Sequence, residues 1–112
     1  MQTLVVGDIH TLQGRRADVV ELLRETQDRV RREPGCLAYT FAEAVADPGR
    51  YVVVQEWHDE AALEAHYASQ AYKTYQQRIG ELLSRPSEVR IHRIAEILHP
   101  ADPGPMDPRR AD

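Results

Sequence analysis

The sequence predicts one α+β domain with a ferredoxin-like arrangement, in which the elements follow the order β-α-β-β-α-β and the four strands form an antiparallel sheet. Stretches rich in β-branched and aromatic residues alternate with stretches that repeat apolar residues every three or four positions. A turn of the Asp-Pro-Gly type joins two of the expected strands. The 112 residues, 42% of them hydrophobic, suffice for a single domain.

The first expected strand covers residues 4–11, where β-branched residues cluster before Gly14. A helix over 15–32 follows, because its apolar residues recur along one helical face. That face consists of Val19, Val20, Leu23, Thr26 and Val30. Pro34 and Gly35 end the helix.

Residues 36–41 alternate as a strand should, and Leu37, Tyr39 and Phe41 are expected on one face. The segment 47–49 then forms a turn of type II, since its Gly accepts a positive φ. The return strand is predicted over 51–57.

Two helices are expected next. Asp59 is a suitable N-cap for residues 60–67, and Ser69 for residues 70–83. Pro86 interrupts the pattern before a last strand, predicted over 88–98.

The domain is therefore expected to span residues 1–98, followed by a disordered tail over 99–112. Four of the seven prolines lie in this tail, which has few apolar residues. Such a segment buries too little surface to offset its ordering entropy.

One face of the predicted sheet has no helix to cover it. Residues 51–54 are apolar at consecutive positions, so both faces of this strand carry apolar side chains. A second copy of the chain would cover the open face, which predicts a homodimer. The alternative is a monomer with a half-polar face, favoured by His92, Arg93 and Glu96 on the last strand.

Composition argues against several partners. A formal net charge of -4 argues against nucleic acid. No apolar run reaches the roughly 18 residues of a membrane span, and residues 1–8 do not resemble a secretory leader. The single Cys36 forms no internal disulfide, as expected of a cytoplasmic protein, and it is expected to be a small buried hydrophobic residue rather than a nucleophile.

Two segments carry a family resemblance. They are Arg32-Glu33-Pro34-Gly35-Cys36-Leu37-Ala38-Tyr39 and Gln55-Glu56-Trp57-His58-Asp59-Glu60-Ala61-Ala62-Leu63-Glu64-Ala65-His66, with Asp47-Pro48 between them and Ser69 and Tyr72 after them. In this order they resemble the antibiotic biosynthesis monooxygenase domain family. The resemblance implies a dimeric α+β barrel. Its members include oxidases of quinols and polyphenols that use O2 without metal or flavin, haem-degrading proteins and isomerases of a phosphorylated sugar-derived signal.

Oxidation without a cofactor needs a base, an apolar cavity and a donor for the developing oxyanion. His66 is the candidate base, and the alternative is a hydrogen-bonded core histidine. The candidate substrate-binding residues are Trp57, Tyr39, Tyr72 and Tyr75, since aromatic rings stack on a flat substrate; simple core packing is the alternative for each.

Other activities find less support. No His or Cys spacing suits a metal, so no metal or other cofactor is expected, and His10 and His92 are expected to pair as neighbours on the first and last strands. The resemblance to haem-degrading members implies a histidine where Gln76 stands and a tryptophan where His66 stands. The isomerase alternative would use Lys73 and Arg78 for a phosphate.

The sequence thus predicts an oxidoreductase, a cofactor-independent monooxygenase that acts on an aromatic quinol or polyphenol. Two alternatives stay open. One is a dimer that binds a small molecule without chemistry, and the other is an isomerase of a small oxygenated metabolite.

Overall fold

The computed structural model describes residues 1–101, and the elements follow the predicted order. The strands are β1 (Thr3–His10), β2 (Cys36–Glu43), β3 (Arg50–Trp57) and β4 (Glu88–Arg93). The helices are α1 (Arg16–Val30), α2 (Glu60–Ala68) and α3 (Gln70–Gly80). Most of the predicted tail, residues 102–112, lies outside the described residues. Within 1–101, no helix is long and apolar enough to cross a membrane.

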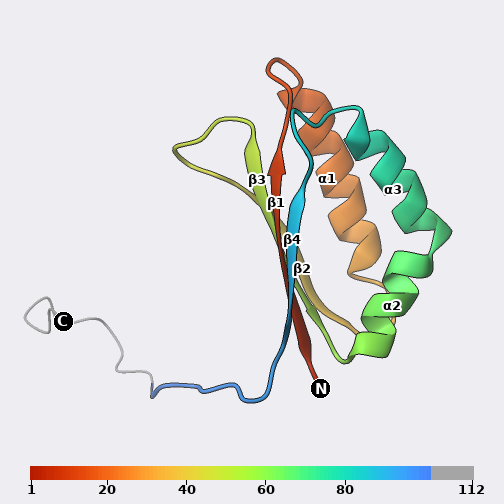
Figure 1. Cartoon of the computed structure of the whole chain (residues 1–112), viewed down its shortest axis with the longest axis vertical. Coiled ribbons are helices and arrows are strands. Elements are labelled where there is room, and N and C mark those ends of the chain that lie inside the picture. The colour runs from red at the N-terminus through yellow and green to blue at the C-terminus, as the bar shows by residue number, and fades with distance from the viewer. Residues whose placement is uncertain (102–112) are drawn as a thin grey trace, which may run out of the picture.

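The four strands form one antiparallel sheet in the order β2-β3-β1-β4, which confirms the ferredoxin-like fold. All three helices lie on one face of this sheet, as Figure 1 shows, and the other face carries no helix. Alternate residues of β1 are buried and half-buried, because successive side chains point to opposite faces. The sheet therefore has a helix-covered face and a bare face.

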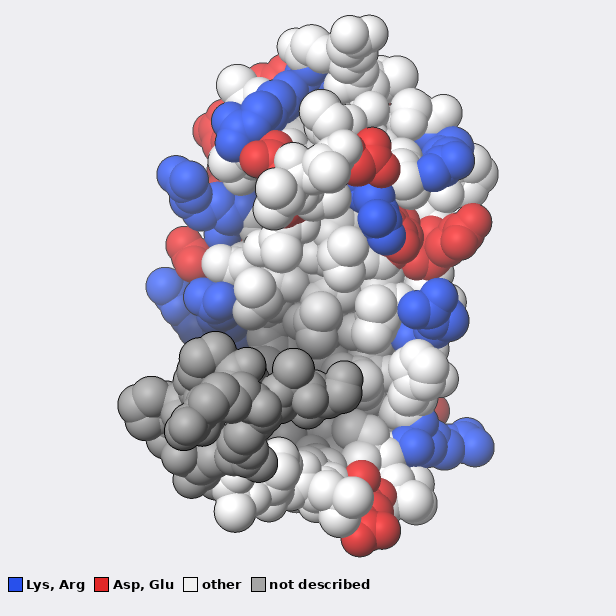
Figure 2. All heavy atoms as spheres, turned by 90° about the vertical axis from the view of Figure 1, so that its left-hand side faces the viewer, with Lys and Arg blue, Asp and Glu red and all other residues white. Residues whose placement is uncertain are grey.

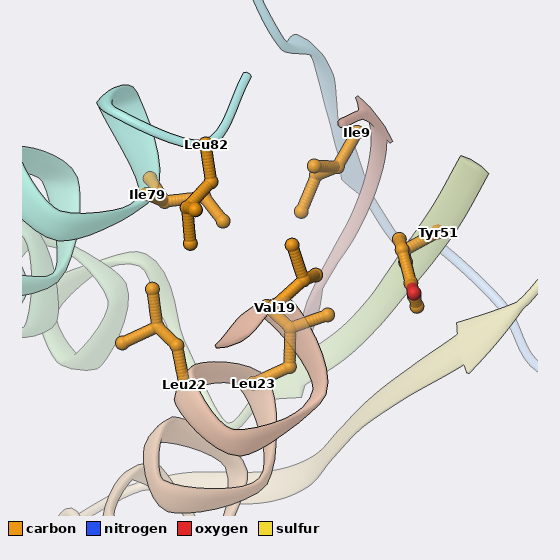
Figure 3. Close-up of a cluster of buried hydrophobic side chains, with 7 residues drawn as sticks. All are labelled: Ile9, Val19, Leu22, Leu23, Tyr51, Ile79 and Leu82. Carbon is orange, nitrogen blue, oxygen red and sulfur yellow. The ribbon is translucent and has the colours of Figure 1, made fainter. Parts of the chain in front are cut away.

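The core lies between the sheet and the helices. One cluster joins α1 to the ends of β1 and α3, and its side chains point toward one another in Figure 3. Its members are Ile9, Val19, Leu22, Leu23, Tyr51, Ile79 and Leu82. A second cluster contains Val5, Val30, Tyr39, Val53, Trp57 and Leu63.

The local signals in the sequence have the expected roles. The Asp59 side chain accepts a hydrogen bond from Ala62 N at 2.9 Å and caps α2. Ser69 Oγ accepts from Tyr72 N at 3.1 Å and caps α3. At the hairpin, Arg50 N donates to Asp47 O, and Gly49 has φ 87°, as a type II turn requires.

Two expected element ends are wrong. The helix predicted to Leu83 stops at Gly80, because Leu82 O accepts from Leu12 N and residues 82–84 pair with the end of β1 instead. The strand predicted to Leu98 stops at Arg93, because its partner strand β1 starts at Thr3.

Two expected side-chain placements are also wrong. A register shift between Cys36 and Ala38 turns Leu37 outward, so Leu37 is exposed while Tyr39 is buried. His92 lies opposite Leu4 in the sheet, and His10 lies opposite Arg50, so the two histidines do not pair.

Candidate functional site

A cavity of about 340 Å³ lies between the helix-covered face of the sheet and helices α2 and α3. Four of the five tyrosines of the chain line it. The lining residues are Gly7, Ile9, Tyr39, Val53, Gln55, Tyr67, Tyr72, Tyr75, Gln76, Ile79, Leu83, Ser87 and Val89. None of them carries a charged side chain. A cavity of this kind suits a ligand with a neutral, flat ring.

The sheet forms the floor of the cavity. Gly7, in the centre of β1, lies opposite Val53 in β3 and Val89 in β4. A Cβ atom at Gly7 would lie 2.8 Å from Val53 Cγ1. Because Gly7 has no side chain, it leaves space in the middle of the cavity floor. Tyr39 on β2 and Gln55 on β3 line the cavity beside this space.

The junction of α2 and α3 forms the opposite wall. Ser69 ends α2 by donating from Oγ to His66 O at 2.7 Å, and it starts α3 as the N-cap. This abrupt change of direction brings the rings of Tyr67 and Tyr72 edge to face, with centroids 4.9 Å apart. Tyr75 follows about one turn later along α3, and its ring centroid lies 6.2 Å from that of Tyr72.

The cavity tyrosines are hydrogen-bond donors. Burial raises the pKa of Tyr39 and that of Tyr75 above the usual value for a phenol, and neighbouring tyrosines add to both shifts. Burial also raises the pKa of Tyr67 and that of Tyr72. These phenols stay protonated at neutral pH, so they can stabilise a developing oxyanion but cannot act as bases.

Trp57 and His66 lie behind this wall and do not line the cavity. The Trp57 indole is fully buried, and its Nε1 donates to Gln55 Oε1 at 3.0 Å. His66 is 2% exposed, and its ring lies 4.9 Å from the Trp57 ring and 5.1 Å from the Tyr72 ring. Trp57 therefore orients Gln55, and His66 contacts the wall from inside the core.

Glu33 is the site residue that the sequence reasoning missed. His66 Nδ1 lies 3.0 Å from each carboxylate oxygen of Glu33. His66 Nε2 is buried and has no hydrogen-bond partner among the described residues. The available signal was the need of a buried imidazole for an acceptor, together with the acidic residue at the start of the Glu33-Pro34-Gly35-Cys36 turn.

Close packing holds this turn against α2. Gly35 has φ 80°, and a Cβ atom there would lie 2.5 Å from Ala62 Cβ. The Gly35 carbonyl also accepts from His58 N at 2.8 Å. The segments 32–39 and 55–66, which carry the family resemblance, thus pack against each other, and this packing places Glu33 next to His66.

Other candidate residues lie elsewhere. Lys73 and Arg78 do not line the cavity, and Arg78 pairs with Glu25 at 2.9 Å. Cys36 is half-buried, and burial raises the pKa of its thiol, which makes it a poor nucleophile. Residues 1–101 contain no cluster of three potential metal ligands.

The fold and the site define a class, that of small ferredoxin-like α+β proteins with an aromatic cavity between sheet and helices. Within that class, the family model for antibiotic biosynthesis monooxygenase matches residues 3–78. The chain belongs to this family.

Relatives support the assignment. "Putative monooxygenase Rv0793" of Mycobacterium tuberculosis is 35% identical over 80 residues, which cover 68% of this chain and 78% of the relative. Its solved structure superimposes with a TM-score of 0.75 at 29% identity, over 91% of this chain and 97% of that one. An uncharacterized Synechocystis protein, sll1783, is 27% identical over 93 residues, or 83% of this chain, and the match spans 63% of its length.

A family structure from Deinococcus radiodurans has a TM-score of 0.84 at 19% identity, and it covers 89% of this chain and 99% of that chain. At this identity the likeness supports the fold alone.

Proposed function

We propose that this protein is a monooxygenase that oxidises a neutral polyphenol or quinol with O2, without a bound metal or organic cofactor. The observation that carries the proposal is the cavity with four protonated tyrosines and no charged side chain. Its size and its aromatic lining suit a flat ring, and its hydroxyl groups suit the oxyanion that forms during reaction.

The chemistry uses the electrons of the substrate. Loss of the phenolic proton gives a phenolate that is rich enough in electrons to reduce O2. The ring C–H beside a hydroxyl then becomes a carbonyl, so that a quinol gives a hydroxyquinone. One oxygen atom of O2 enters this carbonyl, and the other leaves as water with the two hydrogens of the substrate. We assign ring binding to Tyr39, Tyr72 and Tyr75, support of Gln55 to Trp57, and uptake of the phenolic proton to His66.

An oxygen electrode tests this proposal. Chelator-treated protein is mixed with a panel of hydroquinones and naphthohydroquinones, and O2 uptake is recorded. The expected products are the hydroxyquinone and water. We expect uptake with at least one quinol, reduced about 100-fold or more in His66→Ala. Unchanged turnover in a folded His66→Ala variant would remove His66 from the reaction, and no uptake with any quinol would overturn the proposal.

A binding protein without catalysis is the second candidate. It is favoured by the close approach of Trp57, His66 and Tyr72, which leaves the imidazole without contact to the cavity. Such a protein would bind quinols and consume no O2 in the same assay. An isomerase of a phosphorylated metabolite is disfavoured, because a phosphate would meet no cation in the cavity lining.

We also propose that the bare face of the sheet is covered by a second copy of the chain. Leu4, Val6 and Val52 are half-buried there and Val54 is 40% exposed, although all four are apolar. A self-complementary contact between two sheets would remove these side chains from water.

A further inference from the structure

The contact between Glu33 and His66 specifies which imidazole nitrogen carries the proton. Both oxygens of the carboxylate lie 3.0 Å from Nδ1. An ionised carboxylate only accepts hydrogen bonds, so a neutral His66 must donate from Nδ1–H. The free electron pair of the imidazole is then on Nε2.

Within residues 1–101, Nε2 has no hydrogen-bond partner, although the His66 side chain is only 2% exposed. A histidine that serves packing alone is normally satisfied at both nitrogens, because a buried acceptor without a partner is costly. Four aromatic rings surround the imidazole, with centroids between 4.9 and 6.0 Å away. Three of them, Tyr39, Tyr67 and Tyr72, also line the cavity.

We infer that Glu33 and His66 form a proton-accepting pair for the cavity, with Glu33 as the positioning residue. The inference rests on the proposed function. The phenolic O–H bond of the bound quinol breaks and its electron pair stays on oxygen. An N–H bond forms at Nε2. Because no tyrosine hydroxyl is hydrogen-bonded to Nε2 among the described residues, a tyrosine of the wall must turn, or a water molecule must enter, to carry the proton from the cavity. The resulting imidazolium is paired with the Glu33 carboxylate.

Glu33 is suited to this role because it is held in place but only partly buried, with 23% of its side chain exposed. The tight packing of Gly35 on Ala62 fixes the turn that carries it. A fixed carboxylate orients the imidazole and stabilises its charged form, as in other acid–base pairs.

NMR of protein labelled with ¹⁵N-histidine tests the pair without turnover. In the free wild-type protein we expect Nδ1 to be protonated and Nε2 to be unprotonated. Anaerobic addition of 1,4-dihydroxynaphthalene, which cannot be oxidised without O2, should protonate Nε2. The signals of His66 are assigned by comparison with His66→Gln.

Glu33→Gln keeps the shape of the side chain but removes its charge. Because an amide can donate or accept, we expect a mixture of the two tautomers in the free protein and an unprotonated Nε2 in the complex. The kcat for quinol oxidation should fall about 100-fold while KM changes less than threefold. Glu33→Asp should restore the single tautomer and part of the rate.

Glu64→Gln is the matched control. It removes a carboxylate two residues from His66, on the exposed side of α2, and should leave the His66 signals and the kcat as in the wild type. A single Nδ1–H tautomer in folded Glu33→Gln would overturn the positioning role. An unprotonated Nε2 in a wild-type complex that turns over in air would overturn the role as proton acceptor. If no quinol consumes O2, the proposed function fails, and the tautomers of the free protein still decide the role of Glu33.

Discussion

At the scale of single residues, the chemistry of the cavity depends on keeping phenol groups neutral. Tyr39 is 2% exposed, and burial raises the pKa of its hydroxyl above that of a phenol in water. Ionisation therefore disfavours the folded state. The same property that makes the tyrosines good donors to an oxyanion makes the fold sensitive to alkali.

This sensitivity can be measured. The folded pKa of Tyr39 is raised, so its contribution to stability is complete below about pH 10, the unfolded value, and is lost as the pH rises above it. Above about pH 10, a tyrosine as deeply buried as Tyr39 should lower the free energy of unfolding by about 1.4 kcal/mol per pH unit. Urea unfolding at pH 8, 9, 10 and 11 should show a shallower loss in Tyr39→Phe than in the wild type. Parallel loss in the two proteins above pH 10 would contradict this.

The sequence identified aromatic residues that line the cavity, but it did not predict how the residues around them are arranged. Tyr39, Tyr72 and Tyr75 line the cavity, as expected of side chains on the inner faces of their elements. The place of His66 behind the wall, and its contact with Glu33 over a separation of 33 residues, depend on how a turn packs against a helix. Residue spacing along one element contains no information about such a contact.

At the scale of elements, the turn of residues 33–36 joins α1 to β2 and packs on the start of α2. Its glycine serves two purposes, because Gly35 has a positive φ and leaves no room for a side chain against Ala62. Gly14 has nearly the same φ, 81°, but has open space around its Cβ position. Substitutions at Gly14 and Gly35 can therefore distinguish the cost of a positive φ from the cost of a steric clash.

We expect Gly14→Ala to destabilise the fold by about 1 kcal/mol, the cost of a left-handed alanine. Gly35→Ala should cost about 1–3 kcal/mol more, because the added methyl group must displace α2. Urea unfolding gives both values. Gly35→Ala should also disturb the ¹⁵N signals of His66, which Gly14→Ala should leave unchanged. Equal destabilisation by the two substitutions would mean that the turn yields without moving α2.

Some ends of helices and strands are determined by nearby residues, and others by contacts with residues that are distant in the sequence. Asp59, Ser69 and the turn at 47–49 act within a few residues, and the sequence predicted each correctly. The ends of α3 and β4 depend on pairing with β1, which is remote in the sequence. Periodicity alone extended both elements too far.

At the scale of the whole molecule, the bare face of the sheet is the largest feature that the single chain leaves unexplained. Uncharged side chains fill the visible centre of this face, and charged ones lie along its sides and across its upper part (Figure 2). Arg50 donates to both carboxylate oxygens of Asp8, at 2.6 and 2.9 Å, which lowers the pKa of Asp8 and pairs both charges. The apolar side chains and the pairing of Asp8 with Arg50 lower the desolvation cost of placing this face against another copy.

Val54 tests whether two copies meet there. It lies opposite Val6 in the sheet register and is 40% exposed, so a lysine at this position would fold in the monomer but would place a charge in the middle of the contact. We expect light scattering at micromolar concentration to give twice the chain mass of 12.8 kDa for the wild type and a single mass for Val54→Lys. Ala61→Lys, at an exposed position of α2 on the helix-covered side of the sheet, should remain a dimer because it adds the same charge away from the bare face. A wild-type protein with the mass of one copy would overturn the dimer, and because the cavity lies on the opposite face of the sheet, the quinol assay would still decide the activity.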